Sequence, residues 1–160
     1  MIYLGADHAG FQLKEAVKKY LDATGRAYQD LGNFQYHQDD DYPDFSYLVA
    51  NKVSKSSKAR GILFCGSSQG ACITANKVKG VRAASVRNVA EAVLAREHDD
   101  VNIICLAGGR QVQKKFKKVG VPVAEAKKII KAYLATVFSS APRHRRRVNK
   151  IKRIEKQNFR

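Results

Sequence analysis

Short apolar runs alternate along the chain with longer segments in which apolar residues recur every three or four positions. The runs at 2–6, 27–31, 61–65, 81–86 and 101–106 predict five β-strands, of which the second is the weakest. The segments between them predict amphipathic helices, with Gly25 ending the first and Pro122 opening a long late one. This alternation predicts one α/β domain, a Rossmann-like three-layer sandwich around a five-stranded parallel sheet.

The spacing also assigns an inward side to each helix. The helix from Pro43 is expected to bury Phe45, Leu48, Val49 and Val53. An Asn88/Glu91 capping box opens a helix expected to bury Val89, Val93 and Leu94. The helix after the third strand is expected to run through Ile73, Ala75 and Val78, and the late helix to bury Ala126, Ile129, Ile130, Tyr133, Leu134 and Val137.

The chain changes character near residue 140, which divides it into a domain at 1–140 and a basic tail at 141–160. The tail holds nine Lys or Arg and one Glu, with Val148, Ile151 and Ile154 recurring every three residues. Because a helix this basic gains little by packing on its own basic domain, we expect it to dock on a neighbouring subunit. Arg143 and Arg147 share one helix face, where two guanidiniums suit a phosphate.

Composition narrows the classes of protein. The 160 residues carry a net charge of +16, and no apolar stretch approaches the length of a membrane span. With no signal-peptide pattern, a cytoplasmic protein without a membrane partner is expected. The three cysteines suggest neither a disulfide nor a zinc framework. The positive charge suits a small anionic substrate or nucleic acid, but no zinc finger, aromatic RNA-binding signature or recognition helix accompanies it, so nucleic acid is the less favoured partner.

The residues at the ends of the predicted strands suggest chemistry. Cys65 follows a buried strand and precedes small residues and a helix, where backbone N–H groups converge on anions and a cysteine pKa is lowered. Asp7, His8 and the turn at 108–110 fall at other strand ends. Because ligands bind beyond the carboxyl ends of parallel strands, we expect an enzyme acting on a small anionic substrate.

Six sequence blocks resemble the type B ribose-5-phosphate isomerases and the related galactose-6-phosphate isomerase subunits. The blocks follow the family's order and spacing, and the likeness covers about residues 1–155. The six blocks are Gly5–Gly10, Asp41–Pro43, Leu63–Ser67, Ala75–Lys77, Glu97–Asn102 and Arg143–Val148. The resemblance implies an aldose–ketose isomerase that interconverts ribose 5-phosphate and ribulose 5-phosphate through an enediolate, without metal or organic cofactor. It also implies a homodimer or homotetramer with shared active sites. The alternative functions are isomerisation of a hexose phosphate, such as galactose 6-phosphate, and nucleic-acid binding by a basic module.

The resemblance assigns the catalytic roles. Cys65 becomes the base at carbon 2, since Ala71 stands where some members have a glutamate. His98 and Asp7 open the sugar ring. The loop that stabilises the enediolate comprises Gly66, Ser67, Ser68, Gln69 and Gly70. Taken alone, Asp7 equally suits a turn or a helix N-cap, and His98 a cap at a helix end.

The resemblance also assigns the substrate contacts, with some departures. His8, Arg110, Arg143 and Arg147 hold the phosphate and Tyr42 borders the sugar, although Tyr42 also suits a partly buried aromatic role. The segment before Arg110 is one residue longer than usual, Ser68 replaces a usual glycine, and Asp99 replaces a usual asparagine. A carboxylate facing an enediolate is repulsive, so Asp99 implies altered substrate preference, lower activity or a different local arrangement.

Overall fold

A five-stranded parallel sheet in the order β2-β1-β3-β5-β4 forms the centre of the computed structural model, which describes residues 1–109 and 119–159. The strands are β1 (Ile2–Ala6), β2 (Tyr28–Asp30), β3 (Arg60–Cys65), β4 (Ala83–Ser85) and β5 (Ile103–Ala107). The helices are α1 (Phe11–Ala23), α2 (Tyr42–Ser54), α3 (Gln69–Ala75), α4 (Val89–Asp99), α5 (Val123–Ala135) and α6 (Pro142–Asn158).

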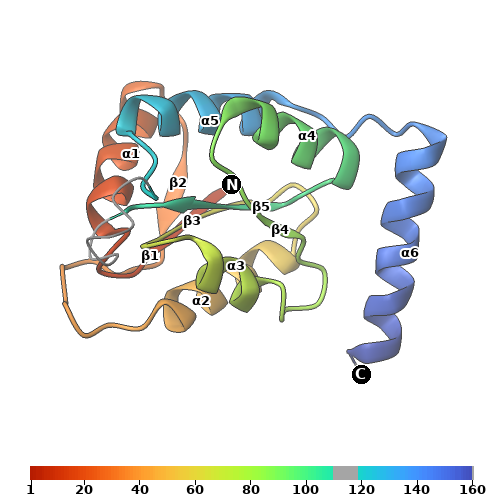
Figure 1. Cartoon of the computed structure of the whole chain (residues 1–160), viewed down its shortest axis with the longest axis horizontal. Helices are drawn as coiled ribbons and strands as arrows, with labels where there is room; N and C mark the ends of the chain where they lie inside the picture. Colours follow the sequence, from red (N-terminus) through yellow and green to blue (C-terminus); the bar gives the residue numbers. More distant parts are fainter. Residues whose placement is uncertain (110–118, 160) are drawn as a thin grey trace.

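The helices lie on both faces of the sheet, as the alternating pattern predicts. Figure 1 shows α1, α5 and α4 above the sheet and α2 and α3 below it. Successive strand residues therefore enter opposite cores: Ile62 and Phe64 pack with the α1, α4 and α5 side, and Leu63 and Cys65 with the α2 and α3 side. The three-layer α/β prediction is confirmed, and it explains why the central strands are apolar without interruption.

The strand predictions hold more closely than the helix faces. The first strand is found where expected, and the Asn88–Glu91 cap forms, with Glu91 N–H donating to Asn88 Oδ1 at 2.9 Å. Leu48 and Leu94, however, are 46% and 49% exposed, and Ser46 and Ala92 are buried on the same helices. Helix α3 ends at Ala75, short of Val78, and Val137 lies beyond α5 and is 76% exposed.

Helix α6 stands at one side of the molecule, beyond the end of α4 (Figure 1). It contacts its own chain through the buried His144 and Val148, and Glu155 accepts a hydrogen bond from Gly80 N–H. Ile151 and Ile154 remain exposed. We expected the tail to gain little by packing on its own domain, but its first half buries His144 and Val148 there. Docking of the tail on another subunit stays a prediction. No helix among the described residues could span a membrane.

Candidate active site

Three strand ends bring the first group of predicted site residues together. Cys65 pairs with Ala107 across β3 and β5, and Gly108 N–H donates to Cys65 O at 2.8 Å. Asp7 N–H donates to Phe64 O at 3.3 Å, so Asp7 follows β1 at the same edge. A Cβ on Gly10 would lie 2.3 Å from the Phe64 carbonyl, and only glycine allows the turn after β1 to approach β3 this closely.

Cys65 lies in this group as a protonated thiol. It is 6% exposed, and burial together with the adjacent Asp7 carboxylate raises its pKa to about 11. Backbone N–H groups of Ser67 and Ala71 act in the opposite direction but do not outweigh these effects. The lowered pKa expected from the helix N-terminus is therefore wrong for the single chain, because α3 has seven residues and the carboxylate lies nearby.

The loop after Cys65 has the left-handed residue anticipated at Ser68. Its φ is 67°, a conformation that glycine adopts without strain. The buried Ser68 hydroxyl lies 2.5 Å from Ser85 Oγ and donates to Ser67 O, which offsets part of that cost. The Tyr42 ring packs directly on Gly70, since an added Cβ there would lie 2.5 Å from its Cζ. The structure thus brings Tyr42 to the loop, while its contact with the sugar stays a prediction.

His8 lies at the same edge and is oriented by a residue that the sequence analysis missed. Asp40 Oδ1 accepts from His8 N–H at 2.7 Å and lies 2.8 Å from His8 Nδ1. Burial acts to lower the pKa of His8, but the bond to Asp40 and the charge of Asp7 outweigh it, so the pKa is raised. Protonated His8 suits the phosphate role. Asp40 lies in a polar loop without periodicity, and no sequence signal marks its contact with His8.

The loop that carries Asp40 is itself anchored by a buried lysine. Lys14 Nζ donates to both carboxylate oxygens of Asp30 at 2.8 Å and to Asn33 O at 2.5 Å. Asn33 Nδ2 donates in turn to Asp40 Oδ2. A chain of hydrogen bonds therefore extends from α1 through this loop to the imidazole of His8.

Asp7 is found in the turn before α1, whose N-cap is Gly10, and its ring-opening role stays a prediction. Its Oδ1 accepts from Gly10 N–H at 2.8 Å, which closes the turn before α1. The same buried carboxylate lies against the Cys65 thiol. Asp7 is therefore a turn residue that also faces the proposed base.

His98 lies elsewhere, at the opposite edge of the sheet. Helix α4 starts after the carboxyl end of β4 and returns toward the start of β5, so its last residues, His98 and Asp99, reach the amino-terminal edge of the strands. The end of α4 lies beside α6, away from the Cys65 loop (Figure 1). One chain therefore does not bring His98 and Cys65 together.

A second missed residue, His144, packs on His98. The two rings lie 4.1 Å apart, and the His144 side chain is buried, with the residue 3% exposed. Its Nδ1 lies 2.6 Å from Ser139 Oγ, and Arg143 Nε donates to its Nε2 at 3.0 Å. Burial, His98 and the neighbouring arginines lower the pKa of His144, so its imidazole is neutral. The sequence placed it among arginines, with nothing to show that it would be buried.

The remaining predicted contacts fall as follows. Arg143 and Arg147 are exposed on the first turns of α6, beside the His98 pair. Asp99 is exposed and accepts a hydrogen bond from Arg82 through its backbone oxygen. Gln69 is the exposed first residue of α3. Arg110 lies outside the described residues.

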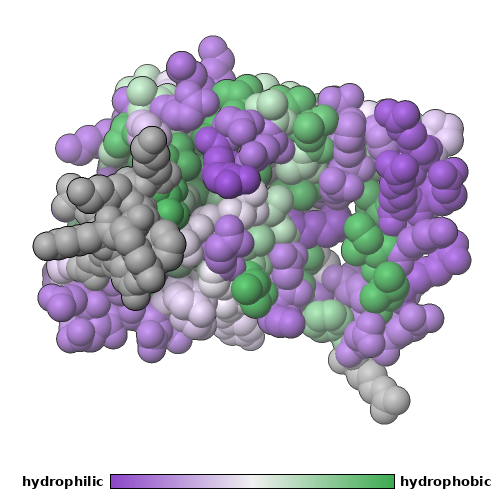
Figure 2. All heavy atoms as spheres, viewed as in Figure 1, coloured by the Kyte–Doolittle hydropathy of each residue, from purple (hydrophilic) through white to green (hydrophobic). Residues whose placement is uncertain are grey.

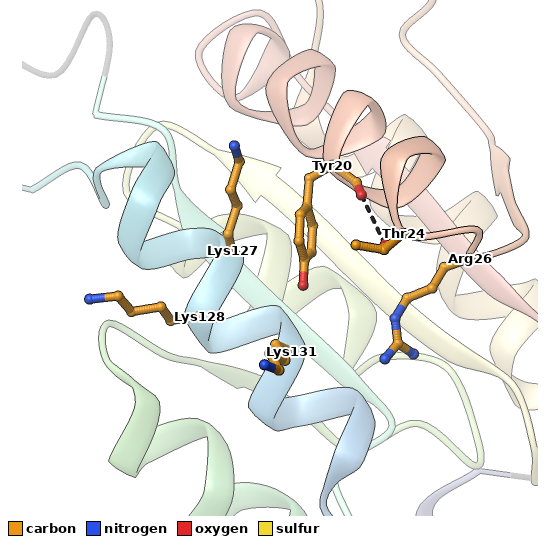
Figure 3. A pocket seen from close by; sticks show the side chains of 6 residues that line it. All are labelled: Tyr20, Thr24, Arg26, Lys127, Lys128 and Lys131. Carbon is orange, nitrogen blue, oxygen red and sulfur yellow. Dashed lines mark hydrogen bonds between the residues drawn. The ribbon is translucent and has the colours of Figure 1, made fainter.

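A hollow between α1 and α5 contains none of the predicted site residues. It has a volume of about 430 Å³ and is lined by Tyr20, Thr24, Arg26, Lys127, Lys128 and Lys131. Figure 3 shows the Lys127 and Lys128 side chains diverging from each other along α5, while Thr24 bonds back to Tyr20. These side chains do not converge on a ligand position. Among the described residues, no three His, Cys, Asp or Glu side chains group as a metal site.

Comparison with known proteins assigns the geometry to a family. The model of the family described as Ribose/Galactose Isomerase matches residues 2–151. The probable ribose-5-phosphate isomerase B of Mycoplasma genitalium is 42% identical over 157 residues, covering 98% of this chain and 96% of the relative. Ribose-5-phosphate isomerase B of Mycobacterium tuberculosis H37Rv is 38% identical, covering 97% of this chain and 90% of the relative.

Solved structures show the same similarity. The crystal structure of ribose-5-phosphate isomerase B from Mycoplasma genitalium with bound ribulose-5-phosphate superposes with a TM-score of 0.88 at 40% identity, covering 98% of this chain and 97% of that one. The type B ribose 5-phosphate isomerase of Trypanosoma cruzi gives a TM-score of 0.84 at 34% identity, covering 98% and 96%. The likeness extends over the whole fold, α6 included.

Proposed function

Because the chain belongs to the ribose/galactose isomerase family, we propose that it is an aldose–ketose isomerase that interconverts ribose 5-phosphate and ribulose 5-phosphate. The observation that supports this most directly is Cys65, held at a strand end between a carboxylate and a loop of backbone N–H groups. A base beside such a loop suits a reaction that removes a carbon-bound proton and forms an oxyanion.

In the proposed reaction, the Cys65 thiolate takes the proton from carbon 2 of the open-chain aldose. The electron pair moves to the carbon 1 oxygen, which gives the enediolate. The proton of the carbon 2 hydroxyl passes to the carbon 1 oxygen. The thiol then returns its proton to carbon 1 while the carbonyl forms at carbon 2, so the base ends as it began. Backbone N–H groups of residues 66–70 would stabilise the enediolate oxygens, and Asp7 and Tyr42 would border the sugar.

The separation of Cys65 and His98 supports a site built from two copies of the chain. His98 would open the ring of a sugar bound at a second copy's Cys65, and Arg143 and Arg147 would hold its phosphate together with that copy's His8. The arginines are exposed, with no described carboxylate in ion-pair range, and so are available to an anion outside their own chain. We therefore propose at least a homodimer.

The fold and the family relation favour the enzyme over the nucleic-acid-binding alternative. The choice between pentose and hexose phosphates rests on substrate comparison. We expect ribose 5-phosphate to be turned over faster than galactose 6-phosphate by the same preparation, measured under the same conditions. Preferred turnover of galactose 6-phosphate would reassign the substrate while keeping the chemistry.

The test is turnover of ribose 5-phosphate by purified protein in the presence of EDTA, with Cys65→Ala and Cys72→Ala variants alongside. Loss of a general base typically costs roughly 10²–10⁴-fold in rate, so Cys65→Ala should lose at least that much. The Cys72 thiol donates to Ala83 O, and only its backbone N–H, which alanine keeps, contacts the loop at Ser68 O. Cys72→Ala is therefore the matched control and should retain activity. A Cys65→Ala enzyme within tenfold of the parent would remove the thiol as base.

A further inference from the structure

A cavity lies on the other side of the molecule from Cys65, where α6 approaches the loops before the strands. Its volume is about 340 Å³, within the range of small-ligand sites. The body contributes Arg60, Lys79 and Arg82, and α6 contributes Lys152, Glu155 and Lys156. Figure 2 shows the outer side of α6 covered with hydrophilic atoms. The cavity contains none of the residues proposed for the active site.

The charges that line this cavity do not balance. Five basic side chains face two carboxylates, those of Asp100 and Glu155. Asp100 is occupied on both oxygens, by Arg96 Nη1 at 2.8 Å and by Arg82 Nη2 at 2.7 Å. Glu155 accepts from Gly80 N–H at 2.5 Å. Among the described residues, no carboxylate lies in ion-pair range of Arg60, Lys152 or Lys156.

The surplus extends into the interior behind the cavity. Arg96 is 3% exposed, and within the described part of the chain its Nε has no hydrogen-bond partner. Burial and the repulsion of Arg96 lower the pKa of Arg60, which shows how closely the guanidiniums are held. Positive charges gathered around two carboxylates that already accept other hydrogen bonds are stabilised by an added anion.

We propose that this cavity binds a phosphate-class dianion, either free phosphate or the phosphoryl group of a small metabolite. The anion would bridge Arg60 and Arg82 on the body to Lys152 and Lys156 on α6. A guanidinium donates to two phosphate oxygens side by side, and the ammonium groups would donate to the other oxygens from the second wall. The Ser57 hydroxyl, also in the lining, offers a neutral donor.

The bridge has a mechanical consequence for α6. The body holds the second half of this helix through few contacts, chiefly Gly80 with Glu155 and Lys79 Nζ with Phe159 O at 3.1 Å. An anion bound between the two walls would add charge-assisted contacts across the gap. It would therefore raise the thermal stability of the folded chain by mass action, independently of turnover.

The test is calorimetric titration of full-length protein with inorganic phosphate at constant ionic strength. Lys152→Gln/Lys156→Gln should weaken the cavity binding event at least about tenfold, because two charged contacts are lost. Lys150→Gln/Arg153→Gln is the matched control, since it removes the same charge from exposed positions of the same helix outside the cavity lining. The control should stay within about twofold, and both proteins should keep the parent's ribose 5-phosphate kinetics.

Several outcomes would decide the matter. The cavity event should persist in Arg143→Ala/Arg147→Ala protein, which separates it from phosphate bound at the proposed active site. Equal weakening in both lysine pairs would show only a diffuse positive field and would overturn the proposal, as would unchanged binding in Lys152→Gln/Lys156→Gln. Titration with glycerol 3-phosphate distinguishes the sources: tighter binding than phosphate indicates a metabolite, and equal or weaker binding indicates free phosphate.

Discussion

The two groups of candidate catalytic residues differ in where they lie and in the charge they present. Cys65, Asp7 and His8 lie at the carboxyl ends of strands, where Asp7 and Asp40 make the surroundings acidic. His98 lies at a helix end, beside a neutral imidazole and exposed arginines. Among the described residues, the Cys65 group offers a phosphate only the His8 cation, whereas Arg143 and Arg147 of the His98 group have no carboxylate in ion-pair range. The difference supports the proposal that two copies of the chain contribute complementary halves of one site.

Co-assembly of two inactive variants would test this complementarity with the largest effect. Cys65→Ala and His98→Asn should each be nearly inactive alone. When the two are co-expressed with different tags and purified as mixed dimers, one of the two sites in each dimer has both residues intact, so about half of parental activity should return. The measurement is ribose 5-phosphate turnover of the doubly purified species. No recovery from stable mixed dimers would place both residues of a site in one chain.

Removing Arg143 and Arg147 tests the contribution of the His98 group to phosphate binding. Arg143→Ala/Arg147→Ala should raise the KM for ribose 5-phosphate roughly a hundredfold, since about 3 kcal/mol of charge-assisted hydrogen bonding is lost. Arg145→Ala/Arg146→Ala removes the same charge from the same helix and serves as control. If the two pairs raise KM equally, the effect is general electrostatic attraction rather than a phosphate contact.

The pKa of Cys65 reports whether the two halves meet. In the isolated chain it is about 11, so the thiol is protonated at neutral pH and the rate of alkylation should rise about tenfold per pH unit below that value. Arginines from a second copy would favour the thiolate and lower this pKa. Iodoacetamide labelling of Cys65, followed by mass spectrometry across pH, should therefore give a midpoint below 11 in the assembled enzyme. The midpoint should move upward in Arg143→Ala/Arg147→Ala, and identical midpoints would contradict the shared site.

The smallest expected effect concerns the loop in the Cys65 half. Ser68→Ala and Ser68→Gly both lose the hydroxyl contacts to Ser85 and Ser67. The alanine variant keeps the strain of the left-handed backbone, whereas the glycine variant relieves it. We expect the alanine variant to be less stable than the glycine variant by about 1 kcal/mol in urea unfolding. Equal stability would show that the left-handed conformation costs little here.

Sequence patterns predicted the strands well because buried parallel strands are apolar on both faces and end at small or polar residues. The helix faces were harder, since an apolar stripe does not tell which contact buries it. Leu48 and Leu94, which were expected to be buried, are exposed. The smaller Ser46 and Ala92 are buried on the same two helices instead. Periodicity locates an amphipathic helix but does not orient it to within one residue.

The site was predictable where a motif fixes the backbone, as at Cys65 and Ser68. It was not predictable where long-range packing decides the outcome. Asp40 meets His8 across 32 positions, and His144 is buried only because α6 folds against α4. The pKa of Cys65 is raised rather than lowered, because burial and the carboxylate of Asp7 outweigh the effect of the short helix α3.

The close approach at Gly10 has a consequence for mutational tolerance. Any side chain at this position would push the turn after β1 away from β3, and the displaced strand end carries the thiol. A saturation library read by isomerase activity should therefore retain glycine alone at position 10. At Gly25, where an added Cβ meets nothing within 4 Å, asparagine and aspartate should survive, because the left-handed backbone is the single constraint. The substitutions tolerated at Gly10 and Gly25 would then show how closely the backbone must pack beside Cys65. They would not depend on a catalytic role of either glycine.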